Sequence, residues 1–264
     1  MKKYFDKNNN RIVCIENRAS SSYWDKHWST NDFESKVGLK FSPFVTGNTE
    51  KYLTKGSKIL EGGCGIGKNV YLLRHYNYEV IGIDYAHETV STVNSLFPDL
   101  DVRFGDVRNL NFPDKYFDGY WSFGVIEHFY NGYDSIMSEM YRVLKKDGYL
   151  FMTVPTLSPI RRYKARNSYY KNWKGSASGK ENFYQFILDP LLIIEDFEKI
   201  GFQLVRTSPY DGVKGLKDEI KFGSGLLQSL YDSQLIVFRI LKKVISFTLQ
   251  RFTSHMTLFI FKKI

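Results

Sequence analysis

Short apolar runs alternate with helical patterns from residue 58 onward, and this alternation constrains the fold more than any other feature of the chain. The expected strands are 58–60, 79–84, 101–106, 117–123, 149–155, 202–208 and 255–263, and the expected helices are 68–76, 87–97, 134–144 and 190–200. Strands separated by single helices form βαβ units, in which neighbouring strands run parallel. The sequence therefore predicts an α/β fold with a doubly wound, seven-stranded, mostly parallel sheet.

Three segments lie outside this alternation. Residues 1–55 precede the first strand and are expected to form an N-terminal helical cap, while residues 56–264 form the main domain. Within the main domain, residues 156–188 are an insertion after the fifth strand and residues 211–254 an insertion after the sixth. A chain of 264 residues is long enough for one large α/β domain with a full core.

The stretch ILEGGCGIG (59–67) joins the first strand to the first helix and offers three glycine-rich patterns. A phosphate-binding loop would need a Ser or Thr hydroxyl for magnesium where Asn69 stands, and Glu61 would place a carboxylate beside the phosphates. A dinucleotide-binding loop would need a third small residue where Lys68 stands. The remaining pattern, an acid followed by G-x-G-x-G, accounts for every position.

This third pattern suits a ligand that carries a cationic amino group. Gly63, Gly65 and Gly67 let the backbone turn sharply and approach a ligand without a Cβ in the way. Glu61, at the end of its strand, can take up an ammonium group directly or through water. Such a loop fits an amino-acid moiety better than a phosphate.

Two further carboxylates follow the next two strands. Asp84 ends the second strand, where a carboxylate can accept from both hydroxyls of a ribose, and Asp106 ends the third, where it can accept from an adenine amino group. One acid each for ammonium, ribose and adenine predicts S-adenosylmethionine as the ligand.

Five stretches, in order and with matching spacing, resemble the class I S-adenosylmethionine-dependent methyltransferases of the type-11 branch, which includes the ubiquinone and menaquinone-biosynthesis methyltransferases. They are ILEGGCGIG (59–67), VIGIDYA (80–86), FGDVRNLNF (104–112), YFDGYWSFGVIEHF (116–129) and RVLKKDGYLFMTVP (142–155). The resemblance implies a Rossmann-like methyltransferase fold for residues 56–264, S-adenosylmethionine as the cofactor and methyl transfer as the activity. Gly62 departs from the family, which usually has an aliphatic residue there.

The resemblance also implies a role for each matching residue. Glu61, Gly63 and Gly65 would hold the methionine end of the cofactor. Asp84 would hold the ribose, and Tyr85 would pack on the adenine unless it simply packs in the core. The other expected contacts are Asp106 and Val107 at the adenine edge, Ser122, Phe123 and Val125 on the far side, and the loop residues Gly62, Cys64 and Gly67.

The stretch SSYWDKHW (21–28) resembles the N-terminal helix that closes over the cofactor in this family. Tyr23 or Trp28 would then contact the methionine carboxylate. The alternative is a buried aromatic stripe, which is the commoner reason for aromatic residues at helical spacing.

His128, in V-I-E-H after the fourth strand, is the candidate general base. The sulfonium already carries an activated methyl group, so a base is needed only if the acceptor must lose a proton. A histidine has a pKa near neutrality, which suits that role. The alternative is that Glu127 and His128 only order the helix that follows.

The insertion 156–188 is expected to be a basic, aromatic lid over the site. Seven basic residues and no acid lie between residues 156 and 180, and Arg161, Arg162 and Tyr163 are the candidate acceptor contacts. Such a lid favours an anionic small molecule, glycan or lipid-linked acceptor, although a solvated loop is an open alternative. Nucleic acid is less favoured, because SFGVIEH (122–128) stands where amino-directed nucleic-acid methyltransferases carry N/D-P-P-Y/W. An RNA methyltransferase and a non-catalytic cofactor-binding protein stay as the alternatives.

The second insertion contains LLQSLYDSQLIVFRILKKVISFTLQRF (226–252), a basic and strongly apolar helical pattern. Arg239, Lys242, Lys243, Ser246 and Gln250 are expected on one face of this helix. Such a helix can lie on an anionic membrane surface. The alternative is that it packs on the domain or in a homodimer, so a monomer and a homodimer are both open.

The composition agrees with an anionic partner and a reducing compartment. The formal net charge is +9, which favours anionic ligands, although solubility alone would also explain it. Cys14 and Cys64 lie far apart without C-x-x-C spacing, and no Cys/His cluster has metal-ligand spacing, so we expect no disulfide and no metal. No apolar leader or membrane-spanning run is expected, which favours a cytoplasmic protein, peripheral to the membrane at most.

Overall fold

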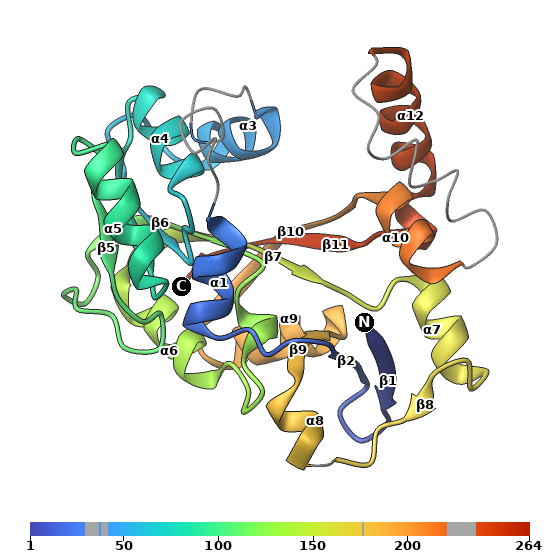
Figure 1. Ribbon diagram of the computed structural model, residues 1–264. Coiled ribbons are helices and arrows are strands. Elements are labelled where there is room, and N and C mark those ends of the chain that lie inside the picture. Colours follow the sequence, from blue (N-terminus) through green and yellow to red (C-terminus); the bar gives the residue numbers. More distant parts are fainter. Residues whose placement is uncertain (30–36, 38–41, 176, 221–235) are drawn as a thin grey trace.

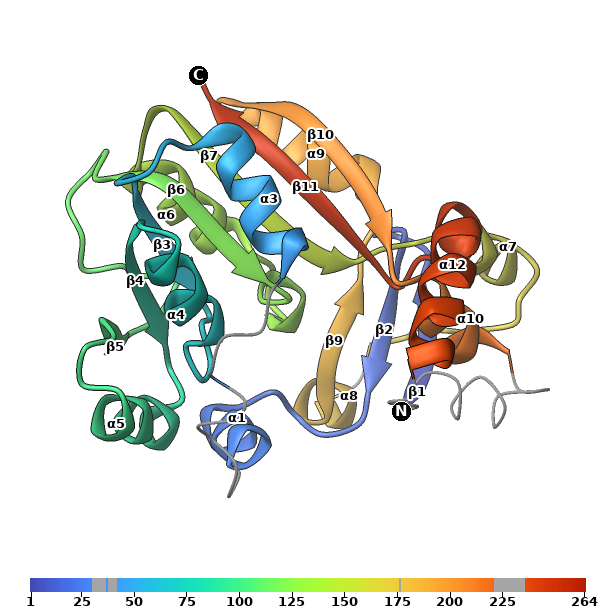
Figure 2. The ribbon, with the colours of Figure 1, turned by 90° about the horizontal axis from the view of Figure 1, so that it is seen from above.

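The computed structural model describes residues 1–29, 37, 42–175, 177–220 and 236–264. Its main sheet has seven strands in the order β10-β11-β7-β6-β3-β4-β5 (Figures 1 and 2). They are β3 (Lys58–Gly62), β4 (Glu79–Asp84), β5 (Val102–Phe104), β6 (Phe117–Phe123), β7 (Leu144–Pro155), β10 (Phe202–Tyr210) and β11 (Met256–Lys263). All neighbours from β7 to β5 pair parallel, and β11 runs antiparallel between β7 and β10. The predicted seven-stranded, mostly parallel sheet is confirmed.

Helices cover both faces of this sheet. The helices on one face are α3 (Pro43–Tyr52), α4 (Lys68–His75) and α5 (His87–Leu96), and those on the other are α6 (Asp134–Val143) and α9 (Pro190–Lys199) (Figure 1). Successive strand residues point to opposite faces, so Ile59 and Trp121 pack under the first group while Leu60 and Tyr120 pack under the second. Burial on both faces explains why these strands are apolar throughout.

A second, four-stranded sheet with the order β8-β1-β2-β9 was not predicted. Its strands are β1 (Lys2–Asp6), β2 (Arg11–Ile15), β8 (Lys171–Asn172) and β9 (Phe183–Ile187), so the N-terminus and the insertion 156–188 build it together. The N-terminal cap is therefore only partly helical, because apolar β1 and β2 pair as a hairpin around the Asn run, with Asn10 at positive φ. The chain division at residue 56 stays a prediction.

The remaining α-helices among the described residues are α1 (Ser21–Trp28), α7 (Pro159–Arg166), α8 (Ala177–Glu181), α10 (Gly212–Glu219) and α12 (Ile236–Thr253). The first ten residues of the predicted 226–252 helix lie outside the described residues, and so does the side chain of Arg239. None of the helices in the described ranges is long and apolar enough to cross a membrane.

The predicted polar face of α12 is partly turned toward α10. The hydroxyl of Ser246 accepts from the backbone N–H of Gly212 at 2.8 Å, and a Cβ on Gly212 would lie 2.7 Å from the backbone of both Ser246 and Gln250. Ser246 and Gln250 therefore lie on the side that packs against α10, because Gly212 lets the two helices approach closely. The outward side of α12 holds other residues.

The glycine at position 62 is explained by a neighbouring tyrosine. A Cβ on Gly62 would lie 2.0 Å from the hydroxyl oxygen of Tyr120, whose side chain is fully buried. The family's usual aliphatic residue would collide with this ring. A glycine at position 62 therefore allows Tyr120 to pack against β3.

We expect Gly62→Ala to lower the free energy of unfolding by about 1–3 kcal/mol, the usual cost of overpacking a core. Tyr120→Phe removes the closest atom and should recover part of that loss in the double variant, by at least about 0.5 kcal/mol. Urea unfolding measures the stability of Gly62→Ala, of Tyr120→Phe and of the double variant. Gly47→Ala in α3 is the matched control, because a Cβ there meets nothing within 4 Å. Strictly additive effects of the two core changes would contradict the explanation.

Candidate functional site

A cavity of about 290 Å³ opens at the carboxyl ends of the parallel strands, where α/β sheets bind their ligands. Nine expected residues line it: Trp28, Gly63, Asp84, Tyr85, Asp106, Val107, Phe123, Val125 and His128. Seven further lining residues were not predicted as contacts: Trp24, His27, Gly105, Arg108, Gly124, Phe129 and Tyr184. The sequence therefore located the cavity but missed half of its aromatic lining residues.

The loop after β3 follows a path that only glycine allows. Gly63 and Gly65 have φ of 75° and 50°. A Cβ on Gly63 would lie 2.5 Å from Val125, and one on Gly65 would lie 2.8 Å from the indole of Trp28. Gly67, with φ of 71°, is the N-cap residue that precedes α4. The loop thus packs directly against the segment that follows β6 and against α1, in left-handed conformations that side chains disfavour.

Glu61 and Ser122 are buried polar residues with unsatisfied atoms. The Glu61 Oε1 accepts from the Asn69 side-chain amide at 2.8 Å, whereas Glu61 Oε2 and Ser122 Oγ have no hydrogen-bond partner among the described residues. Burial raises the pKa of Glu61 to about 8. Because buried polar atoms are normally paired, these two indicate a missing donor or acceptor beside β3 and β6. Cys64 is also buried, and burial raises the pKa of its thiol, so it is not a reactive thiolate.

Asp84 is held by the backbone around it. Its Oδ2 accepts from the N–H of Gly65 at 2.7 Å, and its Oδ1 accepts from the N–H of Ala86 at 2.9 Å. Burial raises the pKa of this carboxyl, and the backbone donors partly offset the rise. Each carboxylate oxygen keeps a second lone pair for a ligand.

Asp106 is already engaged by a neighbour that the sequence did not single out. The Arg108 guanidinium pairs with both oxygens of Asp106, at 2.5–3.0 Å. Partial burial alone would raise the pKa of Asp106, but the hydrogen bonds from Arg108 outweigh it and lower the pKa. Val107 lines the cavity beside this pair.

Helix α1 closes one side of the cavity with Trp24, His27 and Trp28. Two of its residues, Ser21 and Asp25, hydrogen-bond to the main domain. The Ser21 hydroxyl donates to the Tyr85 carbonyl at 2.8 Å, and Asp25 accepts from the N–H and the hydroxyl of Thr89. These contacts hold α1 beside α5.

Tyr23 lies on α1 but is not among the lining residues. Its ring packs edge-on against Tyr184 of β9, with the ring centroids 5.8 Å apart. The predicted contact of Tyr23 with a ligand carboxylate therefore has no support in this arrangement, whereas Trp28 lines the cavity and lies against Gly65 of the glycine loop.

His128 ends the short 3₁₀ helix η1 (Ile126–His128), and its tautomer follows from one contact. Its Nδ1 lies 2.7 Å from the carbonyl oxygen of Tyr184. A carbonyl oxygen only accepts, so Nδ1 carries the hydrogen and Nε2 has a free lone pair. Burial lowers the pKa of His128 to about 4, although the Tyr184 carbonyl partly opposes this. The imidazole is therefore neutral near pH 7, with an unprotonated nitrogen.

A second, larger groove of about 860 Å³ adjoins this cavity. It shares Tyr85, Arg108, His128 and Phe129 with the first cavity, so the two spaces meet at these four residues. Its other lining residues are Arg18, Ala19, Ser20, Ser21, Tyr130, Asn131, Gly132, Asp134, Ser135, Lys180, Glu181 and Phe183.

The candidate acceptor contacts Arg161, Arg162 and Tyr163 line neither space. Arg161 is fully buried, and its guanidinium donates to the carbonyls of Thr156 and His255 at 2.9 Å. Arg162 pairs with Asp189, and Tyr163 is 59% exposed on the surface. The expected role of Arg161 as an acceptor contact is wrong, because α7 turns this side chain into the interior.

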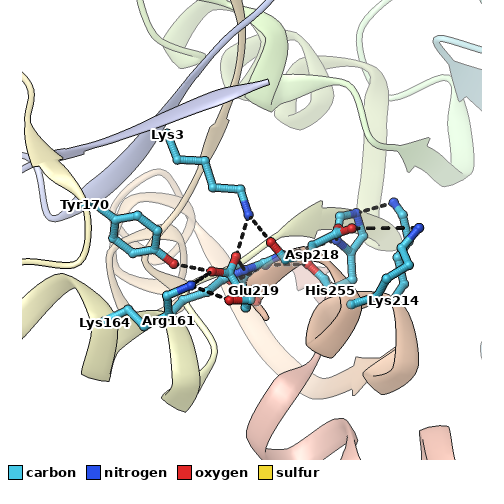
Figure 3. A network of polar contacts seen from close by, with 10 residues as sticks. Lys3, Arg161, Lys164, Tyr170, Lys214, Asp218, Glu219 and His255 are labelled. Atoms are coloured by element: carbon cyan, nitrogen blue, oxygen red, sulfur yellow. Dashed lines mark hydrogen bonds and ion pairs between the residues drawn. The ribbon is translucent and has the colours of Figure 1, made fainter. Parts of the chain in front are cut away.

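The buried partner of Arg161 is Glu219, the centre of a polar network (Figure 3). Glu219 also pairs with Lys3 at 2.6 Å and Lys164 at 3.0 Å, and it accepts from the Tyr170 hydroxyl at 2.5 Å. Burial alone would raise its pKa, but the cations Lys3 and Arg161 lower the pKa of Glu219 to about 2. The network joins β1, α7 and α10.

Comparisons with known proteins agree with this geometry. A family model described as a methyltransferase domain matches residues 60–152. The chain is 37% identical over 109 residues to a probable S-adenosylmethionine-dependent methyltransferase of Mycolicibacterium smegmatis, covering 40% of this chain and 42% of that protein. It is 31% identical over 137 residues to a phosphatidylethanolamine N-methyltransferase of Cereibacter sphaeroides, and the match covers 49% of this chain and 64% of that protein.

The likeness to solved structures extends over nearly the whole chain. A putative methyltransferase solved with the Trm112 methyltransferase activator of Haloferax volcanii matches with a TM-score of 0.59 at 14% identity, covering 93% of this chain and 96% of that one. This match shows the fold. By sequence, the chain spans less than half the length of the first curated relatives it matches.

We expect the imidazole of His128 to stay neutral, with hydrogen on Nδ1, as the pH falls from 7 to 5, because its pKa is about 4. The unfolded chain takes up a proton at the ordinary pKa near 6.5, so this group makes the fold less stable as the pH falls from about 6.5 toward 4. Two-dimensional ¹H–¹⁵N NMR of the imidazole nitrogens reports the tautomer. The signal that is absent from the spectrum of His128→Gln is assigned to His128. A titration midpoint between 6 and 7 would contradict this environment.

We expect Glu219→Gln to lower the free energy of unfolding by about 3–5 kcal/mol, because it leaves the Arg161 charge buried without an anion. The carboxylate's stabilisation is present above about pH 4.5, its usual pKa, and is lost as the pH falls toward 2. Urea unfolding measures the change. Glu50→Gln, in an exposed pair with Lys55, is the control and should cost at most about 1 kcal/mol. Equal effects of the two changes would count against the network.

Proposed function

This chain contains a class I S-adenosylmethionine-dependent methyltransferase domain of the type-11 branch, and we propose that the whole protein is an enzyme that moves a methyl group to an anionic acceptor. The family is an enzyme family whose cofactor is S-adenosylmethionine. One observation supports the proposal most: the neutral His128 lines both the cavity at the strand ends and a second groove. A methyl donor in the cavity and an acceptor in the groove would meet near this side chain.

The residues around the first cavity fit the cofactor. The unsatisfied Glu61 Oε2 and Ser122 Oγ suit an ammonium group, and such a cation would return the pKa of Glu61 from about 8 toward its usual range. Asp84 lines the cavity with lone pairs left for ribose hydroxyls. Gly63 and Gly65 keep the loop free of side chains where a ligand would approach.

The chain's own residues would position the reactants and take up a proton. The sulfonium of the bound cofactor supplies an electrophilic methyl group. Trp24 and Trp28 from α1 would cover the reacting centre and exclude water. Where the acceptor is an O–H or N–H group, the Nε2 of His128 would take up the proton that the acceptor loses on methylation. Tyr184 would keep that nitrogen unprotonated and oriented.

The second groove is the place we propose for the acceptor. Arg18, Arg108 and Lys180 line it, against the acids Asp134 and Glu181. Arg108 is neutralised by Asp106, which leaves Arg18 and Lys180 to attract an anionic group. The aromatic residues Tyr85, Phe129, Tyr130 and Phe183 would contact a less polar part. A carboxylated or phosphorylated small molecule, glycan or lipid-linked acceptor fits this lining.

We further propose a cytoplasmic enzyme that contacts an anionic membrane surface at its periphery. Both cysteines are buried free thiols, which suits a reducing compartment. Whether the working form is a monomer or a homodimer stays open to measurement by sedimentation.

We expect the purified protein to bind S-adenosylmethionine or S-adenosylhomocysteine at micromolar strength and NADH far more weakly. Asp84→Ala should weaken cofactor binding by about 1–3 kcal/mol, because two ribose hydroxyls lose a charged acceptor. Titration calorimetry measures both, and circular dichroism checks the fold. Asp99→Ala, an exposed carboxylate outside the cavity lining, is the matched control. Tight NADH binding without a response to S-adenosylmethionine would refute the assignment.

The same protein tests the acceptor class with S-adenosylmethionine that carries a radioactive methyl group. We expect label in the anionic lipid or glycan fraction of a cell extract, and Arg18→Ala with Lys180→Ala should reduce its transfer while cofactor binding is kept. Label in RNA alone, with a steep dependence on salt, would favour the RNA alternative. Cofactor binding without label in any fraction would favour a non-catalytic binding protein.

A further inference from the structure

We propose that one side of α12 docks the protein on an anionic membrane surface. This side, called the α12 outer face, consists of Lys243, Val244, Phe247, Thr248, Arg251 and Phe252, all of them exposed. Phe247 is 73% exposed, Phe252 62% and Val244 56%, and no large apolar side chain in the described residues is more exposed than Phe247. Exposed aromatic and aliphatic side chains grouped in this way mark an interaction surface.

The spacing of these residues makes them one continuous stripe. Positions i, i+1, i+4, i+5, i+8 and i+9 of a helix fall on the same side, since a turn takes 3.6 residues. The opposite side is occupied: Ser246 and Thr253 bond to the backbone of Gly212, and Gln250 lies against the same residue. Helices α12 and α10 lie side by side (Figures 1 and 2). The contacts of the inner side therefore fasten α12 to α10 and fix which residues point outward.

The charge of the helix selects the kind of partner. The sequence of α12, IVFRILKKVISFTLQRFT, contains no acid, and Lys243 and Arg251 flank the apolar residues of the outer face. Basic residues beside exposed Phe and Val side chains suit the boundary between lipid headgroups and acyl chains. The basic residues add attraction to anionic lipids, which falls off within a Debye length.

A second copy of the chain is a poorer partner for this face. A two-fold interface brings the same patch of both subunits together, so Lys243 and Arg251 would face their own copies. The outer face has no acid to neutralise them. An anionic membrane offers the complementary charge, and the apolar side chains gain burial at the same time.

The test is sedimentation of the full chain with two kinds of vesicle. One kind is phosphatidylcholine alone, and the other is three parts phosphatidylcholine to one part phosphatidylglycerol. The wild type is expected to sediment with the anionic vesicles at low salt, to be released by high salt, and to stay in solution with the neutral vesicles.

Two variants of the outer face should lose binding for separate reasons. Lys243→Glu with Arg251→Glu should weaken it at least about 30-fold, because each basic residue near an anionic surface contributes about a factor of five. Phe247→Ser with Phe252→Ser should weaken it at least tenfold by removing the apolar contact. Lys7→Glu with Lys146→Glu repeats the charge change elsewhere, and Leu191→Ser on α9 repeats the apolar change at a side chain 61% exposed. Both controls should bind as the wild type does.

Three results would overturn the proposal. The wild type could stay in solution with the anionic vesicles at low salt, or the outer-face variants could sediment as the wild type does. Sedimentation velocity could also show a dimer that Phe247→Ser with Phe252→Ser dissociates, which would make the face a contact between subunits. Cofactor binding, measured on the same samples, reports the proposed function separately, because no outer-face residue lines the cavity.

Discussion

The path of the backbone between β3 and α4 is set by close steric contacts, and the site depends on it. Gly62 lies against Tyr120, Gly63 against Val125 and Gly65 against Trp28, each at a distance that leaves no room for a Cβ. The N–H of Gly65 is thereby brought to Asp84, which it helps to orient. The loop, the strand ends and α1 are thus fitted to one another, and a side chain at any of these positions would separate them.

A second dependence runs through the four-stranded sheet. Its strand β9 carries Tyr184, whose carbonyl sets the tautomer of His128. Strand β9 pairs with β2, and β2 pairs with β1, where Lys3 reaches the buried Glu219. The N-terminal hairpin is therefore connected to the side chain proposed as the base through the pairing of β2 with β9, and to α10 through the Lys3–Glu219 ion pair. The additional sheet supports the site as well as extending the fold.

The sequence predicted the main sheet well because each of its strands and helices carries a strong local pattern. Strands such as 79–84 and 117–123 match their predicted bounds, since runs buried on both faces must be apolar. The hairpin of residues 2–15 was missed because its pairing partners β8 and β9 lie more than 150 residues away. The basic residues of 156–180 were expected to face a ligand. The sequence alone does not show which acidic side chain pairs with a basic one, and Arg161 is paired with Glu219 of α10, 58 residues away. The tautomer of His128 likewise depends on a carbonyl 56 residues away.

The position of β11 in the sheet has a consequence for synthesis of the chain on the ribosome. This strand lies between β7 and β10 and pairs with both along most of its length. Until residues 256–263 have been made, β7 has an unpaired edge and β10 has no neighbour in the sheet, although both were synthesised earlier. An exposed edge of that kind can pair with other chains. The main sheet therefore closes late, and the emerging chain needs protection from association over about a hundred residues of synthesis, since β7 ends at Pro155 and β11 begins at Met256.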